Sequence, residues 1–156
     1  MADRLHPSFP EDPDVFTERL RLYPAGVRVL DCDGTACGYL ISHPWRSGTV
    51  PALNILLRHL PADADMYYLH DLALLPPARG TGAARLIVEE MAEHARAKGY
   101  PVMGLVAVNG SVPFWRRCGF AVAEHAAMAE TLASYEEAAP LMIRDLGSRR
   151  MMRPSL

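Results

Sequence analysis

The sequence has little with which a metal ion or a set of disulfides could organise it. It contains only three cysteines, Cys32, Cys37 and Cys118, and no CxxC spacing, so neither a zinc site nor a disulfide framework is expected. Cys32 and Cys37 flank a predicted hairpin turn at Asp33-Gly34 and could face each other. We expect both to be reduced strand residues, so that the fold rests on a hydrophobic core.

Charge of one sign and long apolar runs are also lacking. Sixteen basic residues stand against eighteen acidic ones, for a net charge of -2, so nucleic acid is not an expected partner. The longest apolar run, 102–108, is far shorter than the about 20 residues of a membrane span. The N-terminus carries Asp3, Arg4 and His6 before any apolar stretch, so we expect no signal peptide. We expect a cytoplasmic protein that does not bind membranes.

Lysine is nearly absent, while arginine is abundant, with fifteen arginines to one lysine. We interpret this bias as that of a GC-rich bacterial genome.

The length is that of one domain, because 156 residues, half of them hydrophobic, can bury roughly 70% of the unfolded surface without disulfides or bound metal ions. We expect a single domain over 1–156, with an irregular lead-in at 1–11 and a tail at 147–156.

Caps and hydrophobic periodicity predict an alternation of helices and strands. Asp12 offers an N-cap and Pro13 suits the first position of a helix over 13–23. The connection over 43–65 contains three prolines and a possible short helix at 53–57. Strands are expected at 27–30, 36–42, 66–75, 102–108, 120–123 and 141–143.

A glycine-rich turn joins the apolar strand 66–75 to a strongly amphipathic helix, which Lys98 and Gly99 end. With the following strand this makes a βαβ unit. A glycine turn at a helix N-terminus offers unpaired N–H groups and a favourable dipole to a phosphate. Gly80 and Gly82 allow a phosphate to approach closely, and Arg79 can add a charged contact. A tight turn without a ligand is the alternative.

The wider context of this turn is more specific. The stretch Leu72-Ala73-Leu74-Leu75-Pro76-Pro77-Ala78-Arg79-Gly80-Thr81-Gly82-Ala83-Ala84 resembles the acetyl-CoA motif of the GNAT superfamily of N-acetyltransferases. In that motif a strand and a proline precede R/Q-x-x-G-x-G/A at the start of a helix. Arg79, Gly82 and Ala84 stand at the three specified positions, and Pro76 at that of the proline.

A second family motif follows at the expected spacing. It consists of Asn109 after a strand, then Val112-Pro113-Phe114-Trp115-Arg116-Arg117-Cys118-Gly119-Phe120. The resemblance covers about residues 12–146. It implies an α/β fold with a mixed central sheet of GNAT type flanked by helices. It also implies two splayed parallel strands, 66–75 and 102–108, with acetyl-CoA in the cleft between them.

The resemblance also implies the coenzyme-binding residues. Acetyl-CoA is expected as a co-substrate, with no metal. The residues expected to bind it are Leu72, Ala73, Leu74, Arg79, Gly80, Thr81, Gly82, Ala83, Ala84, Asn109 and Phe114. For Asn109 a plain turn residue before a glycine is the alternative.

Within the superfamily the chain is most similar to the arylalkylamine (serotonin-type) N-acetyltransferases. Those enzymes carry strand histidines before the coenzyme motif and a V-P-F-Y helix start. His70 matches one histidine, Tyr68 stands at the other, and Trp115 replaces the motif tyrosine. A histidine titrates near neutral pH, so the resemblance implies His70 as the catalytic base. A hydrogen-bonded core histidine is the alternative.

Three neighbours of the proposed base are harder to interpret. Asp71 should point to the opposite strand face from His70, as part of a polar network or as an acid in the acceptor site. Tyr68 should share the face of His70. Trp115 lacks useful acidity but can pack on the thioester or the pantetheine arm, and we count it with His70 and Asp71 as a candidate catalytic residue. Cys118 is expected in the core.

The chain departs from the family pattern at its start. Only about eleven residues precede the first predicted helix, so we expect the first strand and helix of the family to be missing. A neighbouring subunit of a homodimer, an upstream start or an open acceptor side would each account for this. Residues 124–138 form either a loop or a solvated helix.

Taken together, the patterns indicate acetyl transfer from acetyl-CoA to a primary amine of a small molecule, by direct attack on the thioester. Acetylation of a protein N-terminus or lysine is one alternative. A catalytically weak acyl-CoA-binding module is another, suggested by Trp115 and by the short N-terminus.

Overall fold

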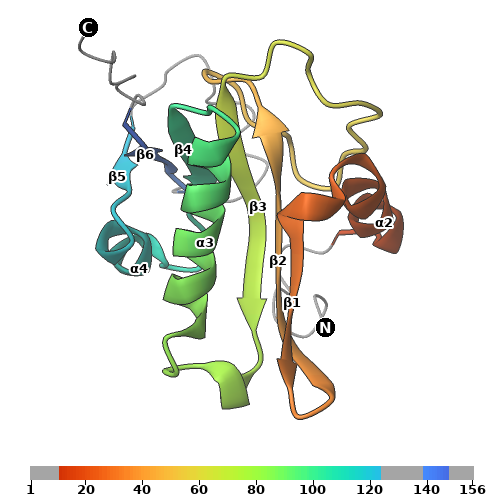
Figure 1. Cartoon of the computed structure of the whole chain (residues 1–156), viewed down its shortest axis with the longest axis vertical. Coiled ribbons are helices and arrows are strands. Elements are labelled where there is room, and N and C mark those ends of the chain that lie inside the picture. Colours follow the sequence, from red (N-terminus) through yellow and green to blue (C-terminus); the bar gives the residue numbers. More distant parts are fainter. Residues whose placement is uncertain (1–10, 124–138, 148–156) are drawn as a thin grey trace, which may run out of the picture.

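The computed structural model describes residues 11–123 and 139–147, drawn in colour in Figure 1. The strands are β1 (Val27–Cys32), β2 (Thr35–Trp45), β3 (Met66–Leu74), β4 (Val102–Val106), β5 (Ala121–Val122) and β6 (Leu141–Asp145). The helices are α2 (Pro13–Leu22), α3 (Ala83–Ala97) and α4 (Val112–Arg117), with short 3-10 turns η1 (Pro24–Gly26) and η2 (Pro76–Ala78).

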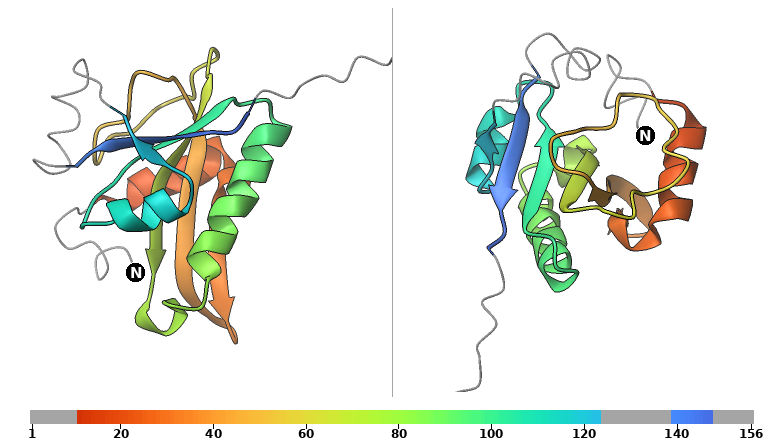
Figure 2. Two further views of the ribbon diagram at one scale, coloured as in Figure 1. Left: turned by 90° about the vertical axis from the view of Figure 1, so that its left-hand side faces the viewer. Right: turned by 90° about the horizontal axis from the view of Figure 1, so that it is seen from above.

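These elements form a mixed α/β fold, as predicted. Within the described residues a six-stranded sheet has the order β1-β2-β3-β4-β6-β5. The β3–β4 pair is parallel and the other neighbours are antiparallel. α2 and α3 lie on opposite sides of the strands β2 and β3 (Figure 2). The segments 1–10, 124–138 and 148–156 lie outside the described residues, so the expectations for the lead-in, the tail and the 124–138 segment are not addressed.

The predicted helix over 13–23 is confirmed as α2, but its cap differs from the prediction. Asp12 occupies the N-cap position without a side-chain capping bond. Its carboxylate instead accepts the side-chain N–H of Asn54 at 3.4 Å, and its own backbone N–H donates to the Asn54 side chain at 2.7 Å. The start of α2 is therefore attached to the loop between β2 and β3.

That loop, residues 46–65, contains no helix, so the short helix expected at 53–57 is wrong. Glu18 and Arg19, both buried on α2, bind three backbone groups of the loop, those of Ile55, Leu57 and Arg58. Backbone groups held by side chains of another element are not free to bond within a helix of their own. The tertiary contacts of α2 thus outweigh the local helix preference.

The hairpin of β1 and β2 corrects the prediction of reduced cysteines. Cys32 and Cys37 are joined by a disulfide, with Cα atoms 6.0 Å apart, within the usual range. Asp33 and Gly34 both have positive φ, 52° and 82°, the geometry of a two-residue hairpin turn. The turn folds the chain back so that the two cysteines meet. Cys118 is free and buried, as expected.

β3, α3 and β4 form the predicted βαβ unit. α3 ends next to Lys98, and Gly99 follows with a φ of 88°, which confirms the predicted C-terminal signals. The inner face of α3 packs on the sheet in one core that also includes side chains of β3, β4 and α4. Its fully buried members include Tyr67, Val88, Met91, Ala92, Ala95, Met103 and Met142.

Within the described residues, no helix has both the length and the apolar composition that a membrane span requires.

Candidate active site

The strands β3 and β4 run parallel but remain paired over only two residues each. The ladder joins Tyr67 with Met103 and Tyr68 with Gly104, although β3 continues to Leu74. Beyond these pairs lies a cavity of about 260 Å³. It is lined by Leu69, His70, Asp71, Leu72, Leu74, Ala84, Leu105, Val106, Val108, Asn109, Ser111, Phe114 and Trp115. The splayed strand pair expected from the sequence is therefore present, and the cavity is called the cleft below.

The glycine turn lies where β3 leads into α3. Gly80 and Gly82 have φ values of 74° and 85°, which residues with a side chain rarely adopt. A Cβ atom at either position would meet no atom within 4 Å, so the turn borders open space. Gly82 is the N-cap of the 15-residue helix α3 and has no side chain to occupy its N-terminus. This geometry suits an anion bound by backbone N–H groups.

Side chains of the same turn brace it. Thr81 donates its hydroxyl to the carbonyl of Ala78 at 2.7 Å, and its oxygen accepts the N–H of Ala83 at 3.3 Å. Arg79 is exposed, and its Nε donates to the carbonyl of Leu74 at 3.1 Å. Ala84 lines the cleft. The turn is thus held by three hydrogen bonds of its own side chains, and Ala84 joins it to the lining of the cleft.

The middle of β3 contains a β-bulge that changes which residues share a face. Ile41 of β2 pairs with Asp71 and Ser42 pairs with Leu69, so His70 is an extra residue in the ladder. An extra residue interrupts the alternation of side chains. His70 lies near the rings of His43 and Tyr68, whereas Asp71 bonds to Tyr39.

The contacts of α2 and α3 identify the faces. Tyr39 packs edge-on against Phe16 of α2, with ring centroids 6.1 Å apart, whereas Ser42 contacts Met91 of α3. Tyr39 and His43 of β2 therefore both face the α2 side, and so do the side chains that they contact, Asp71 and His70. The expectation that Asp71 and His70 point to opposite faces is wrong, because the bulge was not visible in the sequence.

The imidazole of His70 is buried and bonded to a carboxylate. Its Nε2 lies 2.9 Å from Oε2 of Glu11, and the side chains of His70 and Glu11 are only 1% and 5% exposed. The residue as a whole is only partly buried. Because its side chain is almost fully buried, the exposed part is the main chain of the bulge, and this part of His70 lines the cleft. Sequence reasoning missed Glu11, which is 59 positions away and belongs to no motif.

His70 belongs to a series of contacting rings on the α2 side of the sheet. His43 lies 6.2 Å from His70, 5.7 Å from Trp45 and 5.7 Å from Tyr68, measured between ring centroids. The Nδ1 of His43 bonds the carbonyl of Pro44 at 2.9 Å. Tyr68 shares the face of His70, as predicted. His43 was missed, although a histidine among apolar strand residues is a signal that could have found it.

Several of these rings carry buried nitrogen atoms without a hydrogen-bond partner. They are Nε2 of His43, Nε1 of Trp45 and Nδ1 of His70. Buried polar atoms are nearly always hydrogen-bonded in native proteins. The three atoms lie on neighbouring rings of this cluster.

Asp71 has a different environment from His70. Its Oδ2 accepts the hydroxyl of Tyr39 at 2.6 Å, and the residue is partly buried and lines the cleft. An acidic group beside aromatic rings can attract an ammonium group. The structure thus brings two of the three predicted catalytic residues to the same side of the cleft.

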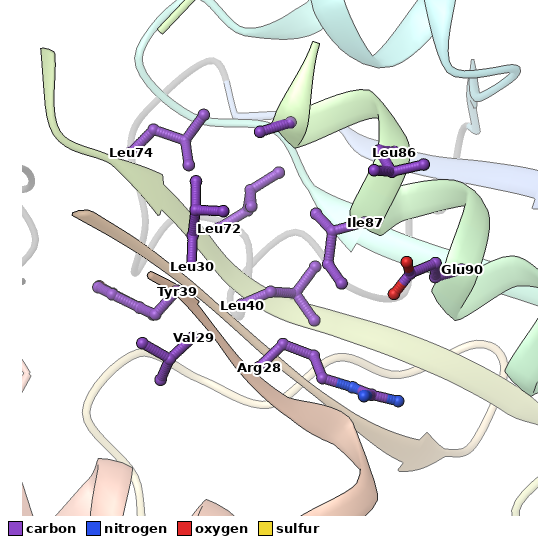
Figure 3. A pocket seen from close by; sticks show the side chains of 11 residues that line it. Arg28, Val29, Leu30, Tyr39, Leu40, Leu72, Leu74, Leu86, Ile87 and Glu90 are labelled. Carbon is purple, nitrogen blue, oxygen red and sulfur yellow. The ribbon is translucent and has the colours of Figure 1, made fainter. Parts of the chain in front are cut away.

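The predicted coenzyme segment of β3 borders the cleft with its leucines. Leu72 and Leu74 line it, whereas Ala73 is buried opposite Tyr39 of β2. Leu72 and Leu74 also line a second cavity of about 260 Å³ between the strands β1–β3 and α3. That cavity is largely apolar, with Leu30, Leu40, Leu86 and Ile87 around it and Arg28 and Glu90 at one end (Figure 3).

The other wall of the cleft comes from the start of α4. Asn109, with a positive φ of 55°, and Phe114 both line the cleft. Trp115 is 8% exposed and packs against Phe114 and Phe120. Its indole N–H donates to the hydroxyl of Ser111 at 3.1 Å. Trp115 is therefore held from both sides and offers the cleft a fixed apolar surface.

Among the described side chains, no group of three or more histidine, cysteine, aspartate or glutamate residues is arranged to hold a metal ion.

Comparison with known proteins identifies the family. The sequence model of the acetyltransferase (GNAT) family matches residues 2–120, which is most of the chain. The chain therefore belongs to the GNAT family and is an acetyl-CoA-dependent N-acetyltransferase. No match is found among curated protein sequences.

Solved structures support the same fold at low sequence identity. The loading GNATL domain of CurA from Lyngbya majuscula has a TM-score of 0.68 and 13% identity, with 86% of this chain and 83% of that chain covered. Naa20 of Chaetomium thermophilum, in complex with a bisubstrate analogue, has a TM-score of 0.63 and 16% identity, with 87% and 74% covered.

A third similar structure contains the coenzyme. N-acetylglutamate synthase from Neisseria gonorrhoeae, complexed with coenzyme A and N-acetyl-glutamate, has a TM-score of 0.57 and 17% identity. The alignment covers 86% of this chain and 32% of that chain. At these identities the likeness concerns the fold alone.

Proposed function

We propose that this enzyme acetylates the primary amine of a small molecule, in the manner of the arylalkylamine N-acetyltransferases that its motifs resemble. The observation that carries the proposal is the parting of β3 and β4 directly beside the glycine turn. The cleft opens between a β3 segment that carries His70 and Asp71 and an α4 start that reads V-P-F-W. Both stretches are those that gave the resemblance.

In this proposal acetyl-CoA binds with its pyrophosphate on the turn 79–84 and its pantetheine arm along the cleft. Arg79, Gly80, Thr81, Gly82, Ala83 and Ala84 hold the phosphates. The main chain of Leu72, Ala73 and Leu74, which has no β4 partner in the ladder, bonds the pantetheine amides. Asn109 and Phe114 complete the other wall. A backbone N–H near Leu74 stabilises the oxyanion that forms on the thioester.

The proposed reaction transfers two protons. The ammonium substrate enters near Asp71 and loses one proton, through water, to His70. The neutral amine then attacks the thioester carbonyl, and the tetrahedral intermediate collapses with loss of coenzyme A thiolate. The second amine proton passes to this thiolate, which leaves coenzyme A as a thiol and the product as an amide. His70 returns its proton to solvent.

The free energies of thiolate departure and of ammonium deprotonation explain why the enzyme can function with Trp115 in place of an acid. The pKa of a thiol, near 8.5, is about 1.5 units above pH 7, so departure of the thiol as thiolate costs roughly 2 kcal/mol. An alkylammonium near 10.4 must lose its proton against about 3.4 units, or roughly 4.6 kcal/mol. The base therefore has the larger task, and an acid is dispensable.

Replacing Trp115 with phenylalanine is accordingly expected to preserve most of kcat. The ring that packs on Phe114 and Phe120 remains, and the variant loses only the hydrogen bond to Ser111, worth about 1 kcal/mol of stability. Initial rates with saturating acetyl-CoA would measure this. Complete loss of turnover in a folded, coenzyme-binding variant would make the indole N–H essential and contradict the scheme.

Replacing Gly82 with aspartate tests the coenzyme site. The new carboxylate would lie at the N-terminus of α3, where the phosphates are proposed to bind, so coenzyme affinity should fall at least about tenfold by calorimetry. Gly99→Asp is the matched control, since Gly99 also has a positive φ and open space around it but lies at the far end of α3. Equal affinities in the two variants would rule out the turn as the phosphate site.

The nature of the amine is tested by a panel of acceptors. Release of free coenzyme A thiol is followed with arylalkylamines, aliphatic amines and peptides with free N-termini or lysines. Turnover of small amines alone supports the proposal. Turnover of peptides alone would assign the chain to protein acetylation, and tight coenzyme binding with no turnover would indicate an acyl-CoA-binding role.

A further inference from the structure

The contact between Glu11 and His70 joins the beginning of the described chain to the bulge of β3. The two side chains are nearly fully buried and lie 2.9 Å apart. Glu11 is also held from its other side, because its Oε1 accepts the backbone N–H of Asn54 at 3.0 Å. A carboxylate held on one side by a buried imidazole and on the other by a backbone N–H has little freedom to turn. It therefore imposes an orientation on the imidazole that it bonds.

The charge of Glu11 determines which ring nitrogen of His70 carries hydrogen. Burial alone would raise the pKa of Glu11, but the hydrogen bond and charge of His70 and the N–H of Asn54 outweigh it and lower that pKa. An ionised carboxylate can only accept hydrogen bonds. Nε2 of His70 must then be the N–H donor, so in the neutral form of the ring the lone pair is on Nδ1, which has no partner.

The other charged and titratable groups near His70 do not compete for this role. On α2, Arg19 is paired with Glu18. On β2, His43 is buried and donates from Nδ1 to the carbonyl of its neighbour Pro44. On β3, Tyr68 presents a ring, and Asp71 accepts from Tyr39. Among the described residues, the carboxylate bonded to His70 is that of Glu11.

We propose that Glu11 is the positioning residue of His70: it fixes the Nε2–H form of the ring and so leaves Nδ1, a buried atom, as the ring nitrogen that takes up the substrate proton relayed to it through water. This inference rests on the proposed function, in which His70 is the base. It extends the site to a residue outside both sequence motifs. Glu11 touches neither substrate nor coenzyme, so it acts through His70 alone.

The first experiment examines the ring without requiring activity. Nitrogen-15 NMR of the full chain labelled at histidine identifies which ring nitrogen of His70 bears the proton, with His70→Gln for the assignment. The expected result is a proton on Nε2 in a downfield position, lost in Glu11→Ala. A proton on Nδ1, or an Nε2 signal unaffected by Glu11→Ala, would overturn the proposal.

The second experiment measures kcat/KM against pH with an amine that the wild type acetylates. Glu11→Gln should lower kcat/KM by less than the roughly 10²–10⁴-fold expected for loss of the base itself. Its acidic limb should move to lower pH, because the imidazolium loses a neighbouring negative charge. Glu11→Asp keeps the charge and should keep the limb in place. An identical limb in Glu11→Gln and wild type would overturn the proposal.

Two control variants separate positioning from simple structural support. Asn54→Gly retains the positive φ and the N–H to Glu11 but removes the side-chain bonds to Asp12. Asp63→Asn removes an exposed carboxylate that pairs with Arg46. Neither should move the acidic limb. If no amine is acetylated at all, the proposed function fails, whereas the NMR result still decides the pairing of Glu11 with His70.

Discussion

Replacing His70 with glutamine is expected to lower kcat by roughly 10²–10⁴-fold, the usual contribution of a general base. Coenzyme affinity should remain unchanged, because the imidazole is buried on the α2 side of β3 and the cleft is bordered by the main chain of the bulge. Glutamine can still donate a hydrogen bond to Glu11 but cannot take up a proton near neutral pH. Steady-state kinetics and calorimetry with coenzyme A measure the two effects separately.

The control for this variant is His59→Gln, which changes an exposed histidine of the 46–65 loop and should leave kcat and coenzyme affinity unaltered. The pH–rate profile provides the decisive observation. If His70→Gln retains the acidic limb of the wild type, another group removes the proton. Asp71, which lines the cleft and bonds Tyr39, would then be the first residue to test, by Asp71→Asn.

The parts of the site that the sequence predicted are local in the chain. The turn 79–84 lies between a strand and a helix that are contiguous with it, and its glycines need backbone angles that few other residues adopt. The same is true of the start of α4, where Asn109, Phe114 and Trp115 lie within seven residues of one another. Short-range rules of capping and periodicity predicted the strand, turn and helices of these segments, and the resemblance of the two contiguous motifs to the GNAT superfamily implied that their residues form the walls of the cleft.

The parts that the sequence did not predict depend on distant contacts or on register. Glu11 meets His70 across 59 positions, and nothing at position 11 distinguishes it from a surface glutamate. The bulge at His70 inverts the face of every later residue of β3, because side chains alternate from one position to the next. The disulfide between Cys32 and Cys37 required the hairpin turn to bring the two Cα atoms within 6.0 Å.

The prediction of a short helix in the 46–65 loop was wrong for a related reason. Its segment 53–57 reads as a short helix on local propensity, which is a weak signal over so few residues. In the structure, two buried charged residues of α2, Glu18 and Arg19, bind its backbone instead. No pattern within the loop itself could reveal partners that lie more than thirty positions earlier.

Lowering the pH from 7 to 5 is expected to reduce the free energy of unfolding by about 2 kcal/mol through His43 alone. Burial lowers the pKa of His43 to about 3, against a hydrogen bond to Pro44 that favours the charged form, and nearby positive charges of His70 and Arg19 add to the lowering. In the unfolded chain the ring titrates near 6.5. The unfolded state therefore takes up a proton first as the pH falls, which favours unfolding.

Because it is the neutral form of His43 that stabilises the fold, the pH range of the effect follows from the two pKa values. The stability that neutral His43 contributes is fully present above about pH 6.5 and declines continuously toward pH 3. Urea unfolding at pH 7 and pH 5 should show the loss in wild type and in His59→Gln, an exposed histidine. In His43→Phe, where a ring still packs between Trp45 and Tyr68, the loss should be smaller by about 2 kcal/mol, since one pKa unit corresponds to 1.36 kcal/mol. The same loss in His43→Phe as in wild type would mean that His43 is protonated in the folded protein or is open to solvent.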